Sequence, residues 1–108
     1  MAGNVSRGDV RLYQFGSPDK TRPVLVLTRD TSLKFLSTAT VAPITASVRG
    51  VASEVQLNEE DGMKTICVVN LQNAVTVPQD RLGRRLAHLG PERMRQVCAA
   101  LLFSLGCE

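Results

Sequence analysis

The stretch of sequence that decides the fold covers residues 22–45 and reads RPVLVLTRDTSLKFLSTATVAPIT. It holds two short apolar runs, residues 24–27 and 40–44, joined by a polar linker. Uninterrupted β-branched and aliphatic runs of this length indicate strands covered on both faces. Proline cannot donate to a strand ladder. Pro23 is therefore expected at the first residue of its strand, and Pro43 is expected to make the end of the second strand an edge or a bend.

A polar side chain stands at the outer margin of each run. Arg22 directly precedes the first run, and Thr45 directly follows the second. A guanidinium can donate two hydrogen bonds to phosphate oxygens, and a hydroxyl can add a third. Composition alone favours simpler roles, namely a solvated arginine at a strand end and a hydroxyl bonded to its own backbone. Proximity of the two residues in space would favour a phosphate site.

Length and composition indicate one globular domain over residues 1–108, which is large enough for a single core. The hydrophobic fraction of 44% and the charged fraction of 21% exclude a disordered chain. The formal net charge is +3, and arginine outnumbers lysine among the cations. This mildly basic balance permits a polyanionic partner, because arginine suits phosphate forks and base stacking.

The cysteine pattern argues against a metal site. Cys67, Cys98 and Cys107 form no C-x-x-C pair, and His88 is the only histidine, so neither a metal nor a cofactor is expected. Cys67 and Cys98 are expected as small buried hydrophobes and Cys107 as an exposed thiol. An odd cysteine count without a signal peptide predicts a reducing, cytoplasmic location. The longest uncharged run is too short for a membrane helix.

Short segments before and after the central stretch are typical of a β-rich fold. Residues 10–15 carry apolar side chains on both faces, which predicts contact with the core on one side and a partner on the other. Ser32 is expected to cap one helical turn, and the acidic turn at 58–62 is expected to be solvated. Further strands are expected at 54–57, 66–69, 75–77 and 81–88, the last with Leu82, Leu86 and His88 facing inward.

One long helix is expected at the C-terminal end. Pro91 suits its first position, and Gly106 suits its end. Apolar residues recur at helical spacing and predict a stripe that docks on the sheet or on a partner; they are Met94, Val97, Cys98, Leu101, Leu102 and Leu105. Several short strands with one terminal helix indicate a mainly β, α+β fold, a small antiparallel barrel closed by the helix.

The order of the motifs resembles the MazF/PemK family of toxin endoribonucleases over nearly the whole chain. The resemblance rests on RPVLVL, VAPIT and the nearby Arg49, and it extends to four flanking motifs; these are Gly8-Asp9-Val10, Ser53-Glu54-Val55, Asn70-Leu71-Gln72-Asn73 and Asp80-Arg81-Leu82-Gly83. It implies the SH3-like barrel with a C-terminal helix that MazF shares with the gyrase poison CcdB. It also implies a homodimer that holds single-stranded RNA in grooves along its interface, and a cognate, MazE-like antitoxin that occupies the RNA groove.

The resemblance also implies which residues carry the chemistry. Arg22 and Thr45 match the family's catalytic pair. In the family, the arginine is credited with acid–base catalysis and stabilisation of the phosphate, and the threonine with binding the phosphate. RNA supplies its own nucleophile, because its 2′-hydroxyl can attack the adjacent phosphate and leave 2′,3′-cyclic phosphate and 5′-hydroxyl ends. No Ser-His-Asp or Cys-His set is evident in the sequence. Since an arginine stays protonated in proteins, electrostatic stabilisation is the role assigned to Arg22.

Four further residues are expected to bind RNA: Lys20 and Arg49 as loop cations, and Gln72 and Asn73 as amides that read base edges. The amides could instead simply close a strand. The first loop is shorter than in many family members, which leaves Asp19 as a poor substitute for an acidic catalytic helper. In addition, Gln72 stands where many members have an acidic residue. Two alternatives stay open, a gyrase poison acting through the C-terminal helix and a noncatalytic SH3-like binding module.

Overall fold

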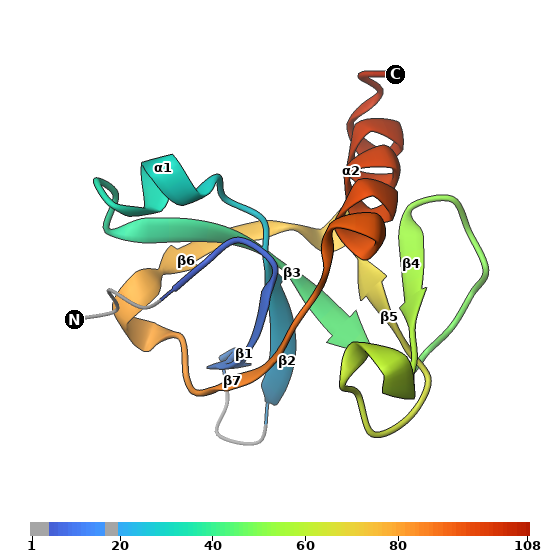
Figure 1. Ribbon diagram of the computed structural model, residues 1–108, viewed down its shortest axis with the longest axis horizontal. Coiled ribbons are helices and arrows are strands. Elements are labelled where there is room, and N and C mark those ends of the chain that lie inside the picture. The colour runs from blue at the N-terminus through green and yellow to red at the C-terminus, as the bar shows by residue number, and fades with distance from the viewer. Residues whose placement is uncertain (1–4, 17–19) are drawn as a thin grey trace.

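The computed structural model describes residues 5–16 and 20–108, and within them one antiparallel, curled sheet wraps around the core with a helix against one end (Figure 1). The sheet has seven strands in the order β4-β5-β3-β2-β1-β7, and β6 also pairs with β3. The strands are β1 (Asp9–Gln14), β2 (Thr21–Val26), β3 (Thr38–Thr45), β4 (Glu54–Leu57), β5 (Cys67–Asn70), β6 (Val75–Pro78) and β7 (Arg85–His88). The helices are α1 (Asp30–Leu33) and α2 (Pro91–Leu105), with 3₁₀ turns η1 (Glu59–Asp61), η2 (Leu71–Asn73) and η3 (Gln79–Arg81). This α+β, barrel-like arrangement confirms the predicted fold class.

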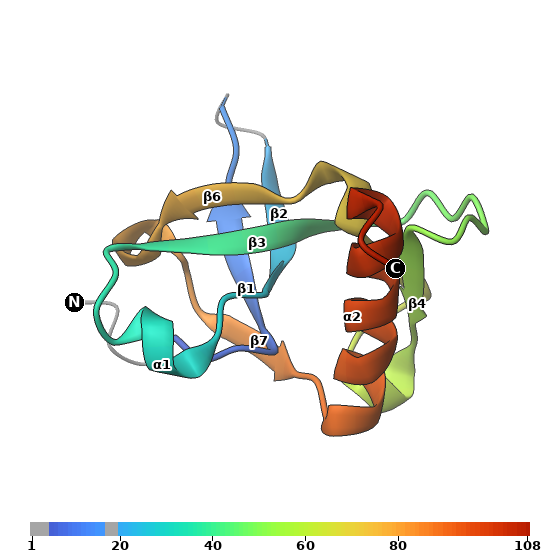
Figure 2. The same cartoon turned by 90° about the horizontal axis from the view of Figure 1, so that it is seen from above.

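Strand β3 is the centre of the sheet, and Pro43 lies inside it rather than at an edge. One side of β3 pairs with β2, where Pro43 stands opposite Val24. The other side pairs first with β6, up to Val41, and then with β5, from Ile44 onward. Figure 2 shows β6 lying alongside β3. The proline therefore occupies the short interval between two partner strands, where a missing N–H costs no ladder hydrogen bond on that side.

Strand β2 begins two residues earlier than expected, at Thr21 rather than at Pro23. The first part of β2 pairs with β1, and Pro23 stands opposite Leu12. Pairing of β2 with β3 begins only at Val24. The proline is tolerated inside the strand because one of its edges is still unpaired at that point.

Side chains of the central strands alternate between two apolar clusters. Leu25 of β2 lies in the cluster that also contains Val97 and Ala100 of α2, whereas Val24 lies in the second cluster, which Leu82 joins from the η3–β7 link. Both Val24 and Leu25 are fully buried. The prediction that this strand is covered on both faces is confirmed. Strand β1 also contacts both clusters, with Val10 in the first and Tyr13 packed against the second.

Helix α2 begins at Pro91 and ends before Gly106, as expected, but it turns a narrower face toward the sheet than the apolar stripe predicts. Gly106 adopts the left-handed conformation with φ of 71°, which glycine tolerates best. Val97 and Ala100 are buried against the sheet. Part of the predicted stripe is exposed, because the helix packs mainly against β4 and η2; the exposed residues of the stripe are Cys98, Leu102 and Leu105. None of the helices in the described ranges is long and apolar enough to cross a membrane.

The cysteines follow the prediction at two positions of three. Cys67 is buried, and Cys107 is exposed. Burial raises the pKa of the Cys67 thiol, and the nearby Asp61 carboxylate raises it further. Cys98 is exposed, contrary to expectation, and its Sγ accepts a hydrogen bond of 2.9 Å from Nη2 of Arg7.

Local structure departs from the predicted elements at three places. Helix α1 starts at Asp30 with Arg29 at its N-cap position, so Ser32 does not cap it. The amide-rich segment leaves the strand after Asn70 and forms η2. Strand β7 begins only at Arg85, and His88 faces solvent instead of the core, whereas Leu82 is buried as expected.

The acidic turn is more structured than a solvated loop. Asn58 and Asp61 form a reciprocal capping box around η1, and Gly62 closes the turn with a φ of 91°. Both carboxylate oxygens of Asp61 accept hydrogen bonds of 3.0 Å from the guanidinium of Arg93. This fork ties the turn to the first part of α2.

Candidate functional site

The strand register brings Arg22 and Thr45 to the same end of the β2–β3 pair. The ladder ends at Val24 opposite Pro43, and continuing this antiparallel register by two residues places Arg22 opposite Thr45. Because side chains alternate along a strand, Arg22 lies on the same face as Val24, and Thr45 on the same face as Pro43. Arg22 is exposed, and Thr45 is half-buried. Both side chains are therefore accessible and lie on the same face of the sheet.

Rigid elements support both candidate residues. Thr45 is the last residue of β3 and pairs with Val68 of β5, next to the buried Ile44. Arg22 pairs with Tyr13 of β1. A site that is built on strands is held more precisely than one on loops.

Lys20 lies just before β2, on the same hairpin as Arg22. The backbone N–H of Phe15 donates to the Lys20 carbonyl at 2.9 Å, which closes the hairpin at this point. The Lys20 side chain is exposed. Asp19, the poor substitute for an acidic helper, lies outside the described residues.

Arg49 lies in the loop between β3 and β4, and its backbone is tied down. The amides of Arg49 and Gly50 both donate to Oε1 of Glu54, at 3.0 and 3.1 Å. Gly50 has a φ of 72°, a conformation that favours glycine. The carboxylate of Glu54 therefore fixes this loop, and the Arg49 side chain is exposed at its surface.

The two candidate amides lie on the other side of β3 from Arg22. Gln72 and Asn73 are exposed in η2, the turn that joins β5 to β6, and both of these strands pair with the edge of β3 that faces away from β2. The side chain of Asn70 accepts a hydrogen bond of 3.0 Å from the backbone N–H of Gln72. Asn70 therefore takes the alternative role of closing the strand. The side chains of Gln72 and Asn73 are left at the surface.

Within residues 5–16 and 20–108, no salt bridge neutralises the candidate cations at this end of the sheet. The salt bridges found within residues 5–16 and 20–108 involve Arg11, Arg85, His88, Arg93 and Arg95. None of these involves the three candidate cations, Lys20, Arg22 and Arg49. Among the described residues, an anionic ligand would displace no salt-bridge partner of these cations.

A second cluster of charged residues, which sequence reasoning missed, surrounds the fully buried Asp9. His88 contacts Asp9 through Nδ1 and Oδ1 at 2.9 Å, and guanidinium nitrogens of Arg11 and Arg85 lie 3.3 and 3.7 Å away. The backbone N–H of Ser6 also donates to Asp9 at 3.0 Å. A signal was present in the sequence, because an acid and an arginine two positions apart on one strand share a face. In the part of the chain described, no three histidine, cysteine or acidic residues could hold a metal ion.

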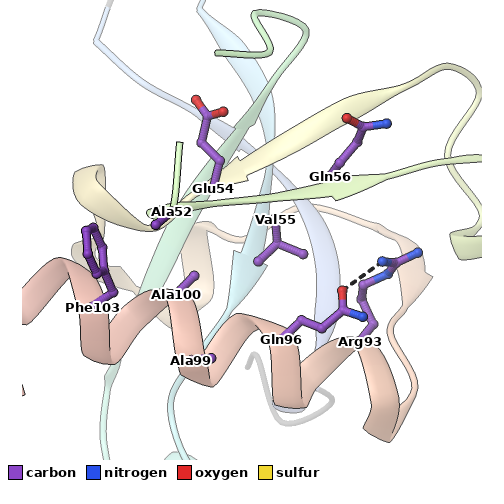
Figure 3. A pocket seen from close by; sticks show the side chains of 9 residues that line it. All are labelled: Ala52, Glu54, Val55, Gln56, Arg93, Gln96, Ala99, Ala100 and Phe103. Carbon is purple, nitrogen blue, oxygen red and sulfur yellow. Dashed lines mark hydrogen bonds between the residues drawn. The ribbon is translucent and has the colours of Figure 1, made fainter. Parts of the chain in front are cut away.

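A groove of ≈ 500 Å³ lies between α2 and β4 (Figure 3). Val55 points from β4 toward the helix, and Phe103 closes one end. Arg93 lines the other end, where it is bound to Gln96 and Asp61. None of the six candidate site residues lines this groove.

Comparison with known proteins gives a consistent result across sequence and structure. Residues 6–105 match the family described as the PemK-like, MazF-like toxin of type II toxin-antitoxin systems. The chain is 41% identical over 109 residues to the probable endoribonuclease MazF5 of Mycobacterium tuberculosis, a match that covers 100% of this chain and 99% of that protein. It is 37% identical over 97 residues to the probable endoribonuclease MazF2 of the same organism, covering 89% and 95% of the two chains.

Solved structures share the same fold. The Mycobacterium tuberculosis toxin MazF-mt6 superimposes with a TM-score of 0.84 at 34% identity, covering 93% of this chain and 98% of that one. A mycobacterial endoribonuclease in complex with its cognate antitoxin superimposes with a TM-score of 0.87 at 23% identity, over 96% and 97% of the chains. Because the sequence match covers nearly the whole chain, this protein belongs to the PemK-like, MazF-like family of type II toxin-antitoxin toxins.

Proposed function

We propose that the endoribonuclease activity of this MazF-family toxin is sequence-specific and metal-independent, and that Arg22 and Thr45 carry it. The observation that supports the proposal is the register of β2 and β3, which directs an exposed guanidinium and a hydroxyl to one end and one face of the sheet. A single phosphate could accept from both donors there. We also propose that residues 1–108 form one catalytic domain.

The chemistry then needs little more than charge stabilisation. The 2′-oxygen of the RNA attacks the adjacent phosphorus, the bond from phosphorus to the 5′-oxygen breaks, and the products are a 2′,3′-cyclic phosphate and a 5′-hydroxyl. The attacking hydroxyl loses a proton, and the leaving oxygen gains one. Arg22 stabilises the extra negative charge on the five-coordinate phosphorus, and Thr45 holds a phosphate oxygen. A preorganised donor of this kind contributes about 3 to 4 kcal/mol to lowering a barrier.

The surrounding candidates would hold the RNA strand. Lys20 and Arg49 would bind phosphates on either side of the reacting one, because neither takes part in an internal salt bridge in the ranges that the structure covers. Gln72 and Asn73 would read base edges, which single-stranded RNA exposes. Because Gln72 and Asn73 lie across β3 from Arg22, the bound RNA would run over the end of the sheet.

The toxin's partners and setting follow from the same proposal. We expect a cytoplasmic homodimer, with the uncovered apolar residues of α2 available for burial between subunits. A cognate, MazE-like antitoxin with an extended, acidic segment would inhibit the enzyme by pairing with the unneutralised cations of the RNA path. Occupation of the path by such a segment would exclude RNA directly.

A cleavage assay in EDTA tests the proposal. Purified toxin is incubated with a long single-stranded RNA, and the ends of the fragments are identified. Discrete fragments with cyclic phosphate ends, whose formation is strongly slowed by Arg22→Ala and unchanged by Arg95→Ala, would support the proposal. Arg95 is a matched control, since it is an exposed arginine on α2 that pairs with Glu92.

Three other outcomes would contradict the proposal. Intact RNA together with trapped gyrase–DNA complexes would identify a gyrase poison that acts through α2. Inactivity in both assays, with a folded protein, would indicate a noncatalytic binding module. Cleavage only when a divalent cation is present would refute the metal-independent mechanism.

A further inference from the structure

One face of the β1–β2 hairpin carries aromatic and cationic side chains in matched positions. Tyr13 of β1 stands opposite Arg22 of β2. Two residues further along, the hydrogen bond from the Phe15 amide to the Lys20 carbonyl makes Phe15 and Lys20 the next pair on the same face. Each candidate cation of the hairpin therefore has an aromatic ring beside it.

The two rings are fixed relative to each other and to the core. Their centroids are 4.8 Å apart, and their planes meet at 70°, an edge-to-face arrangement. Both rings pack against the second apolar cluster, and both stay partly exposed. Each ring is thus partly packed against the protein and partly accessible to solvent.

This concentration of aromatic rings is unusual for the chain. The sequence has one tyrosine, three phenylalanines and no tryptophan. The other two phenylalanines lie outside the hairpin: Phe35, in the turn after α1, is 88% exposed, and Phe103, on α2, is 51% exposed. Half of the aromatic side chains therefore lie next to two cations that take part in no internal salt bridge within the described ranges.

We infer that Tyr13 and Phe15 form a stacking platform for nucleobases of single-stranded RNA, next to the phosphate held by Arg22. This inference rests on the proposed function and adds to it the residues that receive bases. Proteins bind single strands by combining a cationic path for the backbone with aromatic faces for the bases. RNA is preferred over an acidic peptide as the occupant. The carboxylates of a peptide would pair with the cations, but they would not stack on the aromatic rings.

The single tyrosine allows a direct test. With no tryptophan in the chain, the ultraviolet fluorescence of the whole toxin comes from Tyr13. The probe is an uncleavable 2′-deoxy oligonucleotide of mixed sequence, and the control is an abasic oligonucleotide of the same length and charge. We expect the base-containing probe to quench the fluorescence, after correction with free tyrosine amide, and the abasic control to leave it nearly unchanged. Equal quenching by both would overturn the inference.

Substitutions separate stacking from packing. Tyr13→Leu keeps an apolar side chain but removes the ring, and it should weaken binding of the base-containing probe by about 5-fold to 100-fold. Binding of the abasic control should not change. Tyr13→Phe keeps the ring and should restore affinity for the base-containing probe. Phe15→Leu should weaken the binding of this probe in the same direction as Tyr13→Leu.

The outcome can be separated from that of the proposed function. If Arg22→Ala abolishes cleavage while a folded Tyr13→Leu variant binds and cleaves RNA like wild type, the platform is refuted and the nuclease stands. If an acidic peptide quenches Tyr13 and the base-containing oligonucleotide does not, the face binds peptide and the inference also fails. Thermal melts of each variant exclude misfolding as the cause of a loss.

Discussion

Two groups of basic residues in this toxin meet opposite electrostatic environments. At the β1–β7 edge, Arg11 and Arg85 gather with His88 around the buried carboxylate of Asp9. At the start of β2, Arg22 and Lys20 face solvent beside aromatic rings, and none of the salt bridges in the described ranges includes them. The first group shares a buried carboxylate within the fold, whereas we propose that the second meets an external anion. Internal neutralisation is therefore a better guide to function here than the number of arginines.

Removal of the buried carboxylate should produce the largest effect. Asp9→Ala leaves the nearly buried Arg11 without its partner, and we expect a loss of about 3 to 5 kcal/mol in the free energy of unfolding. Denaturant melts measure the loss, and the exposed Asp80→Ala variant is the control. Cleavage by the folded fraction should continue at low temperature. A folded Asp9→Ala variant without activity would show that this cluster also takes part in catalysis.

Loss of the unneutralised arginine should act on the reaction and not on stability. Arg22→Ala should lower kcat about 10²-fold to 10³-fold, because a preorganised donor to the developing charge is lost. Its melting temperature should match that of wild type, since the side chain is exposed. Arg22→Lys should recover only part of the rate, because a lysine cannot form a bidentate fork. Equal rates for Arg22→Ala and wild type would remove Arg22 from the mechanism.

The carboxylate fork between η1 and α2 should have an intermediate effect. Asp61→Asn removes a charged acceptor from the partly buried Arg93, so we expect a loss of about 1 to 3 kcal/mol in the free energy of unfolding. Glu92→Gln weakens the exposed pair with Arg95 and should change stability by less than about 1 kcal/mol. Similar losses in the two variants would mean that burial does not distinguish these ion pairs.

The sequence predicts the elements of the fold because the signals that define them are local. The runs around Leu25 and Val41 indicate buried strands, and Pro91 and Gly106 mark the ends of α2. Long-range pairing explains the failures. Pro43 lies in a central strand because β3 changes partners beside it, and Cys98 is exposed because the sheet covers only the Val97 side of α2.

The candidate site could be predicted only in part. Composition alone cannot place Arg22 opposite Thr45, since that depends on the register of two strands separated by α1. The ordered family motifs supplied this pair, but they gave no indication of Tyr13, which is notable only because it stands opposite Arg22 in the sheet. Likewise Asp9, within the motif Gly8-Asp9-Val10, acquires its role through partners far along the chain.

The smallest effect should appear in the salt dependence of RNA binding, and it compares the two groups of basic residues directly. Each phosphate contact to a single strand adds about 0.7 to the slope of log affinity against log salt. Lys20→Ala and Arg49→Ala should therefore each reduce the slope by about 0.7, whereas Arg85→Ala should leave it unchanged, because its charge already faces Asp9. Titrations of an uncleavable oligonucleotide at several salt concentrations measure the slopes. If Arg85→Ala lowers the slope as much as Lys20→Ala does, the RNA path extends over the β1–β7 edge, and internal neutralisation does not separate structural from functional arginines.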